Sequence, residues 1–144
     1  MKKHMNILKN TVLSALALAV IGFYVPQRAE AETPGHGSLV AQYMKSEKIS
    51  VGVKQAEQIL AVGGKDVLLL DVRTPFEFRM GHIDNAQLIP VQELAARFQE
   101  LNEHRDKLIL VYCRTQNRSS VATEFLRKQG FHAVFVEGGY SAWK

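Results

Sequence analysis

The sequence has few of the residues that build disulfide frameworks or metal centres. Its 144 residues include one cysteine, so no disulfide can form within the chain. The five histidines are scattered, and together with a single cysteine they lack the ligand spacing of a zinc site. The sequence has no internal repeat, no low-complexity tract and no glycine-rich phosphate-binding motif. These absences leave a chain of one-domain length, for which we expect no metal or other cofactor.

The excess of basic residues is concentrated at the N-terminus. The whole chain has 18 Lys and Arg against 14 Asp and Glu. Residues 1–31 hold four of the bases and one of the acids, which leaves 14 basic and 13 acidic residues and a net charge of +1 for the remainder. No basic patch with interleaved aromatic residues is present. We therefore expect no nucleic-acid partner.

Residues 1–31 have the parts of a secretory signal peptide. Three lysines precede the uncharged apolar run 11–25, and Ala29-Glu30-Ala31 offers an A-x-A cleavage site. The run is shorter than the roughly 20 apolar residues of a membrane-spanning helix. We predict cleavage after Ala31 and a periplasmic or secreted protein. Arg28 disfavours cleavage, so a membrane anchor formed by residues 11–25 is the alternative, and it would be the chain's only contact with the membrane.

Residues 108–130 form the centre of the predicted fold. The apolar or aromatic residues 108–112 precede Cys113, and apolar residues at helical spacing follow from Val121 until Gly130. This pattern predicts a buried strand, a tight loop and a helix. Cys113 then lies at the carboxyl end of a parallel strand, which is the edge where α/β sheets bind ligands.

Cys113 is a candidate nucleophile because its neighbours favour a thiolate. Unpaired N–H groups at the start of a helix favour an anion, and Arg114 and Arg118 lie within five residues of the sulfur. The thiolate is the nucleophilic form of cysteine. The alternative is a buried, inert cysteine that caps the strand. In an exported protein, a single exposed thiol is either reactive or pairs with another chain, and we favour a reactive one.

Strands alternate with helices through the rest of the chain. After a polar linker over 32–38, residues 39–44 predict a short amphipathic helix that packs on the domain, with partner docking as the alternative. Further helices are expected before Gly63-Gly64, after a capping box at 74–77, from Val91 to Leu101, and at the end of the chain, where Trp143 is expected in the core. The expected strands are 49–53, 67–72, 87–89, 108–112 and 133–136. This order predicts an α/β domain over 49–144 with a mainly parallel sheet of about five strands.

The strand at 67–72 brings two charged residues to the same edge of the sheet as Cys113. Asp71 ends this strand, where it either supports the loop or is solvated, and Arg73 follows it. We expect Arg73 and Glu77 to form a structural ion pair. His82 could act as a general base beside the cysteine, but we favour a turn histidine that supports loop packing.

Several motifs occur in one order along the chain. They are DVR at 71–73, Glu77-Phe78, GHI at 81–83, A-x-x-I-P at 86–90, CRTQNRS at 113–119 and EGGYSAW at 137–143. This set resembles the rhodanese family of sulfurtransferases, over roughly 49–144. The resemblance implies an α/β rhodanese-like domain, with a mainly parallel five-stranded sheet and helices on both faces. It also implies that sulfur is carried as a persulfide on Cys113.

The resemblance assigns a role to each residue of the loop. Cys113 is the catalytic residue, and the donor-binding residues are Arg114, Thr115, Gln116, Asn117 and Arg118. Asp71, Arg73 and Ser119 support the loop. Gln116 stands where many relatives have glycine, so we expect a slightly reshaped loop there. The implied partners are a small anionic sulfur donor such as thiosulfate and an acceptor that is cyanide, a thiol or a protein.

Two other functions remain open from the sequence. Phosphatases and arsenate reductases that share this fold use a Cys-x5-Arg loop, whereas here Arg118 follows Cys113 after four residues and Ser119 stands in the place of the arginine. A shorter loop makes a smaller cavity, which suits one sulfur atom better than a phosphate. Rhodanese-like domains also serve as binding modules, and these commonly lose the cysteine that is retained here. A sulfur carrier that depends on a protein partner lies between an enzyme and a binding module.

Overall fold

The computed structural model describes residues 36–144, which belong to one compact unit. The predicted signal peptide with its cleavage site, and residues 32–35 of the predicted linker, lie outside the described residues. Among the helices of the described part, none has both the length and the apolar character needed to cross a bilayer.

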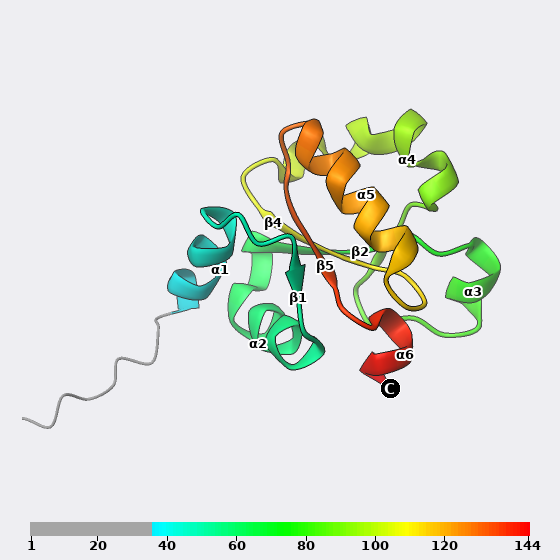
Figure 1. Cartoon of the computed structure of the whole chain (residues 1–144), viewed down its shortest axis with the longest axis horizontal. Helices are drawn as coiled ribbons and strands as arrows, with labels where there is room; N and C mark the ends of the chain where they lie inside the picture. Colours follow the sequence, from blue (N-terminus) through cyan, green and yellow to red (C-terminus); the bar gives the residue numbers. More distant parts are fainter. Residues whose placement is uncertain (1–35) are drawn as a thin grey trace, which may run out of the picture. The chain divides into compact units, whose positions relative to one another are not determined.

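Helices and strands alternate along the described residues (Figure 1). In chain order the elements are α1 (His36–Met44), β1 (Ser50–Val51), α2 (Val53–Gly63), the 3-10 helix η1 (Gly64–Asp66), β2 (Val67–Asp71), α3 (Pro75–Arg79), β3 (Gln87–Leu88), α4 (Val91–Arg97), the 3-10 helix η2 (Phe98–His104), β4 (Leu108–Tyr112), α5 (Asn117–Lys128), β5 (His132–Val136) and α6 (Gly139–Trp143).

The five strands form one sheet in the order β1-β5-β4-β2-β3, and every neighbouring pair is parallel. The prediction of a mainly parallel sheet of five strands is therefore confirmed, and the sheet is parallel throughout. In the central pair, Asp71 of β2 is in register with Tyr112 of β4. This register brings the carboxyl ends of β2 and β4 to one edge, as expected for Asp71 and Cys113.

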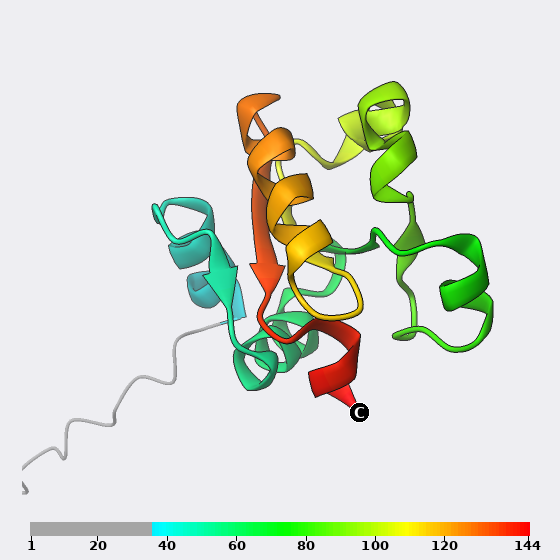
Figure 2. The same cartoon turned by 45° about the vertical axis from the view of Figure 1, so that its right-hand side comes forward.

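Helices cover both faces of the sheet, as predicted (Figures 1 and 2). Side chains of β4 alternate between two core clusters: Leu108, Leu110 and Tyr112 belong to the cluster under α1 and α2. Ile109 and Val111 belong to the cluster under α4 and α5. This alternation follows from the two-residue period of a strand, and it explains why β4 is apolar on both sides.

Several predicted elements are present with shifted boundaries. Helix α1 begins at His36, so the predicted linker is wrong over 36–38. Strand β1 ends at Val51 because Val53 already begins α2. The helix predicted from Val91 to Leu101 changes at Phe98 into a 3-10 helix. A pattern of apolar residues indicates the buried side of an element, whereas backbone hydrogen bonds set its ends.

The N-terminal helix packs on the domain, in agreement with the simpler of its two interpretations. Val40 and Tyr43 are 5% and 4% exposed and belong to the core cluster under α1 and α2. Trp143 packs against the same cluster but is only partly buried, which is less than the core position expected from the sequence.

Candidate active site

Cys113 lies directly after β4, where it is 1% exposed and belongs to the core cluster under α4 and α5. The thiol of Cys113 is thus buried, whereas the sequence led us to consider an exposed thiol. The next residues, 114–117, are exposed: 114–116 form the loop that leads into α5, and Asn117 begins the helix (Figure 1). A buried cysteine at the base of an exposed loop therefore forms the centre of the candidate site.

The loop and the first turn of α5 present a run of free backbone donors. Within the described residues, none of the six N–H groups from Arg114 to Ser119 donates to a protein acceptor. The first hydrogen bond of α5 runs from the Ser120 N–H to the Gln116 oxygen, at 2.8 Å. Consecutive free N–H groups at a helix start form an anion-binding cradle.

Helix α6 fixes the orientation of this cradle. The Tyr140 N–H donates to the Cys113 oxygen at 2.8 Å, and the Ser141 N–H donates to the Arg114 oxygen at 2.9 Å. In a planar trans peptide the C=O and N–H groups point in opposite directions. The N–H groups of Arg114 and Thr115 therefore point away from α6.

This contact between the loop and α6 requires glycine at position 139. The backbone of Gly139 has a φ of 54°, in the left-handed region that favours glycine. A Cβ on Gly139 would lie 2.5 Å from the Cys113 oxygen and would also collide with the Thr115 oxygen. The glycine pair in the motif EGGYSAW thus allows the close approach of α6 to the loop.

Gln116 is accommodated without the strain expected at a glycine position. Its φ is −156°, outside the left-handed region. The side chain of Ser119 is buried, and its hydroxyl donates to the Gln116 oxygen at 3.0 Å. Ser119 thereby supports the end of the loop, whereas the side chains of Arg114, Thr115, Gln116 and Asn117 are exposed.

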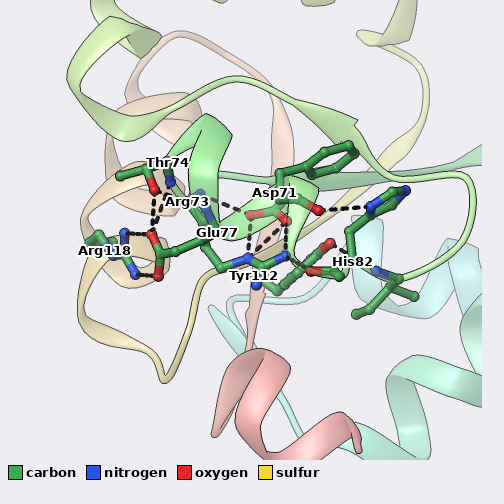
Figure 3. Close-up of polar contacts among 10 residues, drawn as sticks. Asp71, Arg73, Thr74, Glu77, His82, Tyr112 and Arg118 are labelled. Atoms are coloured by element: carbon green, nitrogen blue, oxygen red, sulfur yellow. Dashed lines mark hydrogen bonds and ion pairs between the residues drawn. The ribbon is translucent and has the colours of Figure 1, made fainter.

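Arg118 forms a two-point ion pair with Glu77 (Figure 3). Its Nη1 and Nη2 donate to the two carboxylate oxygens of Glu77, each at 2.7 Å. The predicted ion pair between Arg73 and Glu77 is wrong, because Arg73 turns back onto Asp71 instead. The Glu77 carboxylate raises the pKa of Arg118, with a smaller contribution from the Cys113 sulfur.

Glu77 also completes the predicted capping box of α3. The Thr74 hydroxyl accepts from the Glu77 N–H at 3.2 Å, and the Thr74 N–H donates to Glu77 Oε2 at 3.0 Å. The hydrogen bonds from Arg118 lower the pKa of Glu77 to about 2. The ion pair therefore ties α3 to the first turn of α5.

We expect this ion pair to make stability depend on acid pH. A carboxylate whose pKa is lowered by folding stabilises the protein fully above its unfolded pKa of about 4.3, and the stabilisation is lost as pH falls towards the folded pKa. Glu77→Gln should lower the free energy of unfolding by about 2 kcal/mol at pH 7. This is less than the pKa shift alone corresponds to, because Glu77 is 24% exposed and solvent screens the ion pair. Urea unfolding of both proteins at pH 7 and near pH 2 measures the difference. An equal difference at the two pH values would contradict the assignment.

Asp71 and Arg73 form a buried pair beneath the site. They are 0% and 3% exposed, and Arg73 Nη2 lies 2.7 Å from Asp71 Oδ2 (Figure 3). The solvated alternative for Asp71 is therefore wrong. Arg73 also donates to the Gly81 oxygen at 2.8 Å and lies over the rings of Tyr112 and Tyr140. The pair thus fixes the end of β2 to the turn at Gly81 and to α6.

Tyr112 extends this network to the following loop. Its hydroxyl accepts from the Ile83 N–H at 3.2 Å, and its pKa is raised, first by burial and then by Asp71. His82 stacks on Phe78 at 3.7 Å and lies 3.0 Å from the Phe78 oxygen through Nδ1. His82 therefore has the packing role that we favoured from the sequence.

An open cleft of about 330 Å³ lies next to the loop. The cleft is lined by residues of α3 and α6, by residues that directly follow these two helices, and by two arginines. The lining residues are Arg73, Phe76, Glu77, Met80, Gly81, Arg114, Tyr140, Ser141 and Lys144. Among the described residues, no three His, Cys, Asp or Glu side chains gather as metal ligands would.

Two functional contacts were missed by the sequence analysis. The Glu77–Arg118 pair joins residues 41 positions apart, and no local spacing indicates it. The contact of α6 with the loop does have a signal in the sequence, the pair Gly138-Gly139. Both glycines have positive φ, at 73° and 54°. Adjacent glycines before a helix indicate a close backbone approach.

The fold and site define a class of protein. An all-parallel α/β domain carries one cysteine at the carboxyl edge of its central strand, followed by a loop of free N–H groups and a helix. A family model described as the rhodanese-like domain matches residues 53–144. The chain belongs to the rhodanese-like family.

Known relatives agree with this assignment. A sulfurtransferase of Allochromatium vinosum is 39% identical over 80 residues, which cover 55% of this chain and 73% of that protein. The tRNA uridine(34) hydroxylase of Citrobacter koseri is 33% identical over 92 residues, but these cover only 26% of its length and 60% of this chain. The crystal structure of a rhodanese-related protein from Thermoplasma volcanium has 39% identity and a TM-score of 0.57, and the match covers 65% of this chain and 88% of that one. The chain is therefore related to proteins of sulfur transfer.

Proposed function

We propose that this protein is a sulfurtransferase that moves sulfane sulfur from an anionic donor such as thiosulfate to a thiophilic acceptor through a persulfide on Cys113. The observation that carries the proposal is the buried cysteine followed by six free N–H groups. Such a cradle can stabilise the negative charge of a persulfide, as an oxyanion hole stabilises oxygen. The named sulfurtransferase among the relatives supports the same class of reaction.

The reaction proceeds in two displacement steps. The Cys113 thiolate attacks the outer sulfur of thiosulfate, a sulfur–sulfur bond forms, and the bond to the sulfite sulfur breaks with its electron pair leaving on sulfite. Cyanide, or a second thiolate, then attacks the terminal sulfur of the persulfide. The product is thiocyanate or a new persulfide, and the Cys113 thiolate is regenerated. This is covalent catalysis, for which ping-pong kinetics are expected.

Arg114 is the cation that best fits the anionic end of the donor. It follows Cys113 directly, is exposed, lines the cleft and has no carboxylate partner within the described residues. The charge of Arg118 is compensated by Glu77, so its contribution is to hold the loop through this ion pair. Asp71, Arg73 and Ser119 act as positioning residues.

Intact mass measurement tests the proposal directly. The reduced protein should gain one sulfur atom on addition of thiosulfate and should lose it on addition of cyanide. The matched control is Cys113→Ala, which replaces a small buried side chain and should gain nothing. A folded, reduced protein that gains no sulfur from thiosulfate would contradict the proposed donor.

Burial of Cys113 favours a second candidate, a sulfur carrier that works only with a protein partner. The residue is 1% exposed and does not line the cleft. A partner that shifts the exposed loop 114–116 would then be needed for rapid transfer. This candidate predicts a persulfide that forms but turns over slowly with cyanide.

We also propose that the protein acts after export, on the basis of the signal-like residues 1–31. Fractionation of the producing cells, followed by intact mass of the purified protein, tests this. A mass equal to that of the chain from Glu32 onwards supports cleavage after Ala31. Recovery of the complete chain from membranes supports the alternative, an anchor formed by residues 11–25.

A further inference from the structure

Two large apolar side chains, Phe76 of α3 and Met80 directly after this helix, are exposed on one side of the cleft. Phe76 is 64% and Met80 is 72% exposed, and both line the cleft beside Tyr140. Residues four apart on a helix lie on the same face. Single exposed apolar residues are ordinary, but a group at the rim of a cleft indicates an interaction site.

Helix α3 is held in place, so this apolar face has a fixed position. Its start is capped by Thr74 and Glu77, and Glu77 is bound by both terminal nitrogens of Arg118. Two residues after its end lies Gly81, whose oxygen accepts from Arg73. A fixed apolar surface loses little conformational entropy when a partner covers it.

The opposite side of the cleft carries uncompensated positive charge. Arg73 and Glu77 each have an ionic partner, whereas within the described part of the chain Arg114 and Lys144 have none. Lys144 lies over the Tyr140 ring, with Nζ 4.6 Å from the ring centroid. Arg114 is adjacent in sequence to Cys113. The cleft therefore combines an apolar side with a cationic side next to the reactive loop.

We propose that the cleft between α3 and α6 is the docking surface for a protein sulfur acceptor, whose cysteine lies in an acidic segment with an apolar side chain beside it. Charge complementarity selects the acidic segment, since Arg114 and Lys144 line the cleft without an ionic partner among the described residues, whereas Glu77 in the same lining is already paired with Arg118. Phe76 and Met80 receive the apolar side chain. Thiosulfate and cyanide are small polar ions that make no use of the apolar side formed by Phe76 and Met80, and this unused side points to a macromolecular acceptor.

This inference rests on the proposed function and completes its second step. The acceptor cysteine loses its proton to solvent, and its thiolate attacks the terminal sulfur of the Cys113 persulfide. A sulfur–sulfur bond forms on the acceptor, and the bond to Cys113 breaks with its electron pair remaining on the Cys113 thiolate. No oxidant or reductant is consumed.

Two synthetic peptides serve as probes for the full chain. Each has one cysteine next to one leucine, flanked by aspartates in the first peptide and by lysines in the second. Transfer is followed in a single turnover from a persulfide loaded beforehand, so that donor binding does not enter the rate. We expect the acidic peptide to react at least about tenfold faster than the basic one at low salt, and this preference to shrink as salt is added.

Variants separate the two sides of the cleft. The double variant Phe76→Ala, Met80→Ala should slow transfer to the acidic peptide by about tenfold and leave the cyanide reaction within about twofold of the unaltered protein. The matched control is Ile49→Ala, Val121→Ala, which removes two exposed apolar side chains that do not line this cleft and should change neither rate. Lys144→Glu should reduce or reverse the preference for the acidic peptide.

Binding without chemistry distinguishes failure of docking from failure of the proposed function. Fluorescence anisotropy measures binding of the acidic peptide, with serine in place of its cysteine, to the Cys113→Ala chain. We expect a Kd of about 10–100 µM that the Phe76 and Met80 variant weakens. Equal binding of acidic and basic peptides, or an unchanged Kd in that variant, would overturn the docking proposal. If the acidic peptide binds as expected but the unaltered protein forms no persulfide with thiosulfate, only the proposed function is overturned.

Discussion

Gly139→Ala should reduce sulfur transfer by at least about 100-fold, because it removes the contact that orients the loop. The new Cβ would collide with the oxygens of Cys113 and Thr115. To relieve the collision, the loop must move away from α6, and the bonds from Tyr140 N and Ser141 N are lost. Loss of one donor from an oxyanion hole costs about 10²–10³ in rate, which sets the expected scale.

The control for this prediction is Gly64→Ala. Gly64 also has a positive φ, of 48°, but a Cβ there meets nothing within 4 Å. This variant introduces the strain of a positive φ at alanine without any collision of the new Cβ. It should lower the free energy of unfolding by about 1 kcal/mol and leave sulfur transfer unchanged. Thiocyanate formation and urea unfolding are measured for both variants. If the two variants lose equal stability and neither loses activity, α6 has no role in orienting the cradle.

Asp71→Ala should lower the free energy of unfolding by about 3–5 kcal/mol, because it leaves a buried arginine without its counter-ion. Arg73 is 3% exposed and donates three side-chain hydrogen bonds to the two Asp71 oxygens. A loss of this size approaches the whole stability of a small domain. Urea unfolding followed by circular dichroism at pH 7 measures the change.

Two further variants keep this second prediction testable if Asp71→Ala does not fold. The double variant Asp71→Leu, Arg73→Met replaces the pair with apolar side chains of similar size and should recover at least half of the lost stability. Glu100→Gln breaks the exposed ion pair with Arg97 and should leave the unfolding midpoint nearly unchanged. A double variant as unstable as Asp71→Ala would mean that Arg73 stabilises the fold through Gly81 and the tyrosine rings instead.

The predictability of the site differs from residue to residue. Cys113, the loop and the strand edge followed from an apolar run, a break and helical spacing, which are local patterns. The ion partners of Arg73 and Glu77 did not follow from local patterns. An arginine side chain can reach several carboxylates, and only the folded backbone decides which of them it pairs with. Arg73 bonds Asp71 two residues before it, and Glu77 bonds Arg118 from a different helix.

The accessibility of the thiol also required the folded chain. Two arginines beside Cys113 suggested an exposed, charged setting, but the strand alternation that sends Val111 into the core under α5 sends Cys113 to the same cluster. Burial is a property of what packs on a residue, and sequence neighbours do not specify it. For the same reason, the sequence did not show that the apolar residues Phe76 and Met80 are exposed.

The sequence by itself determined the alternating α/β order with a mainly parallel sheet, the capped start of α3, the glycine end of α2 and the position of the cysteine after the central strand. These features depend on periodicity, capping and backbone preferences that act over a few residues. Only the tertiary structure decided which charges pair, how deeply Cys113 is buried and that the α6 N–H groups hold the loop. These depend on contacts between segments distant in the chain, whose geometry is fixed when the two faces of the sheet are packed.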